Sequence, residues 1–130
     1  MRRNPGREAG LLIIRLMAGG MILTHGIPKL LRFFGEEPIT FADPFGLGPV
    51  ISLGLAVFAE VFCAVLIIIG YKTRLATIPL MITMLTAAFY AHWSDPFGRK
   101  ELPLLFFTVF LAILIFGGGK YALDNLGKRR

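Results

Sequence analysis

VISLGLAVFAEVFCAVLIIIG, residues 50–70, is the stretch that decides the fold of this chain. It is long enough to cross a bilayer, whose hydrocarbon core needs about 20 apolar residues in a helix. Its one charged residue, Glu60, lies near its middle. A charge at that depth costs roughly 2.5 to 3.5 kcal/mol on insertion scales, and residues of this kind usually have a function. The stretch therefore predicts a membrane helix with a polar site inside the bilayer.

The composition of the whole chain supports a membrane protein. Hydrophobic residues make up 55% of the sequence and charged residues 17%, which is more apolar than a soluble domain. Three further stretches approach the length of a span, at about residues 11–30, 75–93 and 102–119. We predict one integral membrane domain over residues 1–130, folded as an all-α bundle of four transmembrane helices.

The basic residues predict the orientation of this bundle. Of the 14 lysines and arginines, ten belong to the N-terminal part, the turn at residues 71–74 and the C-terminal part, which four spans place on one side. Basic residues mark the cytoplasmic side, so we expect both termini in the cytoplasm and the protein in the plasma (inner) membrane. The net charge of +6 then indicates topology and affinity for anionic lipid, not a nucleic-acid surface.

Small and polar residues share one face of each of the first three predicted helices, at about 100° per residue. On the first helix this face consists of Arg15, Ala18, Gly19, Ile22, His25, Gly26 and Lys29. On the second it consists of Ser52, Ala56, Glu60, Cys63 and Ala64, and on the third, more weakly, of Thr77, Met81, Ala88 and His92. Small residues let helices approach closely in lipid, so we expect the first two faces to meet.

Depth in the bilayer groups the ionisable residues. A rise of about 1.5 Å per residue places Glu60 near the midplane, His25 outward of it, and Lys29 and His92 near the outer boundary. Side chains lean toward the N-terminus of their helix, so Glu60 should point toward His25. Arg15 lies apart, near the inner boundary. We predict a polar ladder that opens to the outer face, beneath an irregular aromatic loop at residues 32–49 that could cap the bundle.

This ladder has two interpretations. A carboxylate and an imidazole suit proton exchange with a small amphipathic ligand such as a quinone, so the candidate site residues are Glu60, His25, Lys29, His92 and Arg15. Alternatively, such residues only hydrogen-bond helices together, at about 0.6 kcal/mol each, or extend their polar ends to the interface.

The order and spacing of several motifs resemble a known family. They are Arg15-Leu16-x-x-Gly19, His25-Gly26-x-x-Lys29-Leu30, Glu60, Gly70 with Thr73-Arg74, His92, and Gly119 with Leu123-Asp124. This combination is similar to the DoxX family of small four-helix membrane proteins, named after a membrane subunit of thiosulfate:quinone oxidoreductase. The resemblance implies a quinone-linked redox subunit or accessory in bacteria, and it carries over the same five candidate residues without assigning their roles.

Several kinds of chemistry are disfavoured by the sequence. The single cysteine, Cys63, allows no intramolecular disulfide and no C-x-x-C relay. Haem ligation by His25 and His92 is disfavoured because they lie at different depths, and no dense ligand spacing predicts a metal site. No redox cofactor can be inferred from the residues of this chain, so catalysis by this chain alone is not expected. Electrons would come from a soluble or membrane redox partner or from the ligand.

Two other functions stay open beside the redox subunit. One is a proton-coupled carrier of a small amphiphile. Small multidrug transporters place their carboxylate in the first helix, whereas this first helix carries Arg15, His25 and Lys29, which would repel cationic substrates. The other is a structural membrane anchor for soluble redox partners. A protonophore-sensitive uptake assay would distinguish the carrier from the rest.

Overall fold

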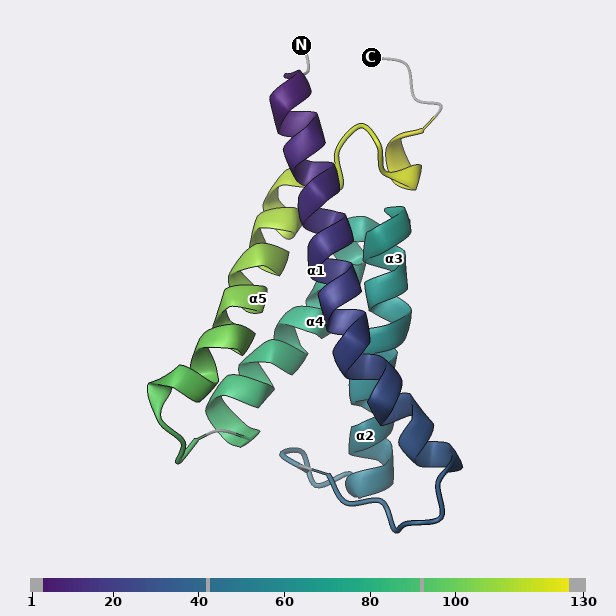
Figure 1. The fold of residues 1–130 in the computed structure, drawn as a ribbon, viewed down its shortest axis with the longest axis vertical. Coiled ribbons are helices and arrows are strands. Elements are labelled where there is room, and N and C mark those ends of the chain that lie inside the picture. Colours follow the sequence, from purple (N-terminus) through teal and green to yellow (C-terminus); the bar gives the residue numbers. More distant parts are fainter. Residues whose placement is uncertain (1–3, 42, 92, 127–130) are drawn as a thin grey trace.

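A computed structural model describes residues 4–41, 43–91 and 93–126, and every regular element in these ranges is a helix (Figure 1). The elements are α1 (Pro5–Leu31), η1 (Arg32–Phe34), α2 (Pro49–Val57), η2 (Phe58–Cys63), α3 (Ala64–Ile69), α4 (Thr73–Thr86), η3 (Ala87–Ala91), α5 (Phe97–Phe116) and η4 (Leu123–Asn125). Two of the short elements, η1 and η4, are 3-10 turns, and η2 and η3 are π-helical. The all-α class predicted from the sequence is confirmed.

Three helical segments of the described chain are long and apolar enough to cross a membrane. They are Pro5–Phe34, Pro49–Ile69 and Thr73–Tyr90. The second of them is one continuous rod formed by α2, η2 and α3, called the α2–α3 rod below. These segments match the first three predicted spans in position.

The fourth predicted span, residues 102–119, corresponds in part to α5. This helix starts at Phe97, so Arg99, Lys100 and Glu101 lie within its first five residues, and these charges set it apart from the three segments above. It ends at Phe116, three residues before the expected end, because Gly117 adopts a φ of 80° that stops the helix.

The first helix packs against the α2–α3 rod through glycines. A Cβ added to Gly26 would lie 2.6 Å from the backbone oxygen of Glu60, and one added to Gly19 would lie 2.6 Å from a side-chain carbon of Ile68. Only residues without a side chain permit this approach. The predicted meeting of the two small-residue faces is therefore confirmed.

The remaining helices complete the bundle. In Figure 1, α4 and α5 run side by side and pack against each other, while α4 also contacts η2. The core between them is apolar and includes Ile22, Leu80 and Phe110. Many apolar side chains face outward instead, such as Leu75 at 67% exposure and Leu105 at 62%. A bilayer accounts for this outward apolar surface, because lipid replaces water there.

Arg15 ties three parts of the chain together at one end of the bundle. Its side chain is buried, and its Nε donates a hydrogen bond of 2.9 Å to the carbonyl of Gly118. Its Nη1 donates to the carbonyls of Ile67 (3.0 Å) and Ile68 (2.8 Å). The last carbonyls of a helix have no partner within that helix. Arg15 supplies that partner for α3 and attaches the segment after α5 at the same time.

Asp124 accepts hydrogen bonds from backbone N–H groups at the start of α4, as Arg15 donates to carbonyls at the end of α3. Its carboxylate accepts hydrogen bonds from the backbone N–H groups of Lys72 (2.7 Å) and Thr73 (2.9 Å) and from the Thr73 hydroxyl (2.9 Å). Carboxylates are favoured partners of these first N–H groups. The Asp124 N–H donates in turn to the carbonyl of Gly70 (2.9 Å). Residues 117–126 thus fold back over this end, beside the start of α1 (Figure 1).

Two glycines of α1 provide a matched test of the helix contact. Gly26→Ala should lower the free energy of unfolding by about 1 to 3 kcal/mol, because the added methyl group overlaps the Glu60 backbone. Gly20→Ala should leave it unchanged or raise it by up to about 1 kcal/mol, because nothing lies within 4 Å of the added carbon and alanine favours a helix. Denaturant unfolding in mixed micelles measures both. Equal effects of the two substitutions would contradict the contact.

Arg15 gives a second test of the fold. Arg15→Met preserves much of the side-chain volume but leaves three buried carbonyls without their donor. Hydrogen bonds to charged groups contribute about 1.5 to 3 kcal/mol each, so the free energy of unfolding should fall by about 3 kcal/mol or more. Arg99→Met, at an exposed position in the first turn of α5, is the control. A similar loss in both variants would show that Arg15 has no special role.

Candidate functional site

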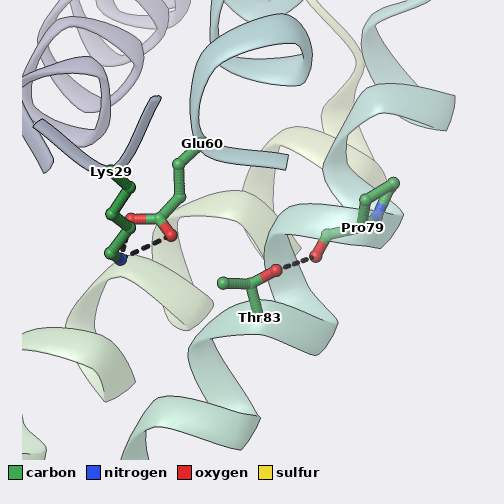
Figure 2. A network of polar contacts seen from close by, with 4 residues as sticks. All are labelled: Lys29, Glu60, Pro79 and Thr83. Atoms are coloured by element: carbon green, nitrogen blue, oxygen red, sulfur yellow. Dashed lines mark hydrogen bonds and ion pairs between the residues drawn. The ribbon is translucent and has the colours of Figure 1, made fainter. Parts of the chain in front are cut away.

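Glu60 and Lys29 form an ion pair between η2 and α1 (Figure 2). The Lys29 Nζ lies 2.8 Å from Oε1 and 2.6 Å from Oε2 of Glu60, so one ammonium group engages both oxygens. The Glu60 side chain is 2% exposed and that of Lys29 is 30% exposed. The pair is therefore closed on the carboxylate side and partly open on the ammonium side.

Local backbone geometry positions both residues. Glu60 lies in the π-helical segment Phe58–Cys63, inside the otherwise α-helical rod. Such wider turns are rare and occur frequently at functional sites. Gly26 brings α1 against the backbone of Glu60 itself. Lys29 follows Gly26 by about one turn, and its long side chain returns to the carboxylate.

An aromatic side chain from the loop, Phe41, lies close to the ammonium group of the pair. The Lys29 Nζ is 5.8 Å from the centre of the Phe41 ring, and the Arg32 guanidinium carbon is 6.0 Å from it. Both distances suit a cation above an aromatic face. Arg32 also donates to the carbonyl of Thr40. Phe41 of the aromatic loop thus lies beside the ion pair; whether the loop caps the bundle stays a prediction.

Asp43 holds the rest of the loop against α2. Its Oδ1 accepts hydrogen bonds from the Leu47 N–H (2.9 Å) and the Ser52 hydroxyl (2.8 Å), and its Oδ2 accepts one from the Gly48 N–H (2.9 Å). The hydrogen bond from Ser52 and, to a smaller extent, the one from Gly48 lower the pKa of Asp43 below its usual value. The carboxylate therefore stays ionised at neutral pH and keeps the loop in place.

Figure 2 also shows Thr83 of α4, whose hydroxyl donates a hydrogen bond of 2.8 Å to the carbonyl of Pro79. This hydroxyl is engaged within its own helix. Throughout the described part of the chain, every buried side-chain nitrogen or oxygen has a hydrogen-bond partner. The Lys29 ammonium of the pair, by contrast, is partly exposed and can donate a further hydrogen bond.

The structure brings together two of the five residues singled out in the sequence. His25 is exposed, and among the described residues none forms a hydrogen bond or ion pair with it. Gly26 faces Glu60, and His25 lies about 100° around α1 from Gly26, so its side chain is turned away from Glu60. Lys29, not His25 as we expected, is the residue that pairs with Glu60. Arg15 is at the opposite end of the bundle, and His92 lies outside the described residues.

Sequence reasoning missed the π-helical segment and the role of Asp43. Nothing in the run of residues 58–63 differs from an ordinary apolar helix apart from Glu60. Asp43 is followed by Pro44 and Gly46, which is a turn signal, but that signal does not reveal which groups the carboxylate binds. Within the described ranges, no group of three or more His, Cys, Asp or Glu side chains could hold a metal ion.

Comparisons with known proteins agree with this architecture. The DoxX family model matches residues 10–93. The Escherichia coli inner membrane protein YphA is 30% identical over 132 residues, covering 94% of this chain and 93% of YphA. A Bacillus subtilis protein named "Putative oxidoreductase CatD" is 28% identical over 123 residues, covering 93% and 89%.

A Haemophilus influenzae protein named "Uncharacterized protein" is 31% identical over 122 residues, covering 88% of each chain. No solved structure matches this chain. The matched range 10–93 takes in most of α1, the α2–α3 rod and α4, and with them the ion pair of Lys29 and Glu60. On this evidence the chain is a membrane protein that belongs to the DoxX family.

Proposed function

We propose that this protein is a quinone-linked redox subunit or accessory of the bacterial plasma membrane. Membership of the DoxX family supports the proposal, as do a relative named as an oxidoreductase and another named as an inner membrane protein. We further propose four spans with both termini in the cytoplasm. The apolar part of α5, residues 102–116, packs along α4 and would form the fourth span.

The observation that carries the proposal is the half-open ion pair of Glu60 and Lys29. A quinone headgroup is a flat ring with carbonyl oxygens that accept hydrogen bonds. The Lys29 ammonium is a charged donor with one side exposed, and Phe41 offers an aromatic face beside it. The residues present therefore fit such a headgroup. A bound quinone would supply two-electron redox chemistry, which the side chains themselves lack.

Each residue has a separate task in this proposal. Lys29 donates a hydrogen bond to the headgroup, and Glu60 holds the ammonium in position through both of its oxygens. Glu60 can also accept a proton at either oxygen. His25, exposed on the same helix, serves proton exchange at the edge of the site and not as the partner of Glu60. Electrons come from a partner protein.

Binding of a short-chain benzoquinone to the protein in nanodiscs, measured by titration calorimetry, tests the proposal. Lys29→Met should weaken binding about tenfold to a hundredfold, because a charge-assisted hydrogen bond contributes about 1.5 to 3 kcal/mol. Glu60→Gln should weaken it less, since the donor remains but loses its support. Thr24→Ala is the control, because this exposed hydroxyl bonds only to the Met21 carbonyl of its own helix.

A double variant separates binding from folding. Lys29→Met with Glu60→Gln removes both charges together, so no unpaired charge is left in the bundle. Full quinone affinity in this folded variant would overturn the site. Absence of saturable binding to the wild-type protein would overturn the quinone ligand altogether and would favour the carrier, which an uptake assay with a protonophore would then detect.

A further inference from the structure

At the end of the bundle that holds Arg15, acidic and basic side chains differ in their surroundings. The two described carboxylates there accept hydrogen bonds from backbone N–H groups. Glu8 is buried and accepts a hydrogen bond from the Lys120 N–H, and Asp124 accepts from the start of α4. Apart from the buried Arg15, the described basic side chains at this end are exposed, namely Arg7, Lys72, Arg74 and Lys120. This end of the bundle therefore presents a cationic surface, although it contains acidic residues.

Two of these cations converge on the end of α5. The guanidinium carbon of Arg7, from α1, lies 5.6 Å from the centre of the Phe116 ring. The Nη2 of Arg74, from α4, lies 3.5 Å from the Ile115 carbonyl. A Cβ added to Gly117 would lie 3.2 Å from the same Nη2. Two guanidinium groups from distant parts of the chain thus rest on three consecutive residues.

Tyrosines beside two of these cations are typical of a surface at the level of lipid headgroups. The Lys72 ammonium is 5.7 Å from the ring of Tyr71, and the Lys120 ammonium is 5.7 Å from the ring of Tyr121. Both tyrosines are nearly half exposed. Tyrosines collect at the boundary between hydrocarbon and water, so the neighbouring arginines lie within reach of phosphate groups.

We propose that Arg7 and Arg74 form a binding site for the phosphate of an anionic phospholipid. Guanidinium groups bind phosphate oxygens through paired hydrogen bonds, and basic pockets between membrane helices bind anionic headgroups. The acyl chains would lie on the flank of α5, where Ile115 is 64% exposed and Phe116 is 52% exposed. This apolar flank directly beside the two cations favours a lipid over a soluble anion.

Lipid retention by the purified full-length protein tests the proposal. Native mass spectrometry in detergent would compare phosphatidylglycerol with phosphatidylcholine of the same acyl chains. The wild-type protein should prefer phosphatidylglycerol, and Arg7→Gln and Arg74→Gln should each lower that affinity about fivefold, since a basic residue at an anionic surface contributes about 1 kcal/mol. Affinity for phosphatidylcholine should not change.

Arg99→Gln is the matched control, because it removes the same charge from an exposed position at the other end of α5. An equal loss of phosphatidylglycerol in this variant, or full retention in the folded Arg7→Gln/Arg74→Gln variant, would overturn the site. Inorganic phosphate should not raise the melting temperature as the lipid does. An equal rise would overturn the lipid in favour of a soluble anion. If the double variant fails to fold, full retention of phosphatidylglycerol by the folded single variants Arg7→Gln and Arg74→Gln would overturn the site.

Discussion

The contact between Gly26 and the backbone of Glu60 is the constraint on which the rest of this structure depends. A side chain of any size at position 26 would meet the oxygen, carbonyl carbon and Cβ of Glu60 within 2.8 Å. In lipid there is no hydrophobic force between helices, so close packing must hold them together. The glycine brings α1 near enough for Lys29 to reach a carboxylate that is otherwise closed in by apolar neighbours.

The two ends of the bundle satisfy their polar groups differently. At the Arg15 end, backbone groups are the partners: Arg15 donates to three carbonyls, and Asp124 accepts from two N–H groups. Such bonds close the ends of helices and fix the returning C-terminal segment. At the other end, Lys29 and Glu60 bond to each other and leave part of the ammonium exposed. The first arrangement closes the ends of helices, and the second leaves part of a charged donor exposed.

Helical periodicity predicted most of the packing face of α1. Of the residues assigned to that face, Arg15, Ala18, Gly19, Ile22 and Gly26 are buried, whereas His25 is exposed. Periodicity could not choose between His25 and Lys29 as the partner of Glu60. The two lie only about 40° apart around the helix, and the choice depends on side-chain length and on the π-helical segment. Residues 117–126 show no helical or strand periodicity in the sequence, so their return over the bundle could not be predicted. The hydrogen bond of Arg15 to the Gly118 carbonyl could therefore not be predicted either.

Comparison of Arg15 with the ion pair of Lys29 and Glu60 explains why the pair, not Arg15, is the better candidate for function. Arg15 has a structural reason to be charged, because three carbonyls need a donor that no apolar side chain supplies. Lys29 and Glu60 satisfy only each other. Apolar residues of similar volume often replace a buried ion pair without loss of stability, or with a gain. Packing alone therefore gives no reason for this pair, whereas a ligand that needs a charged donor beside an aromatic face does.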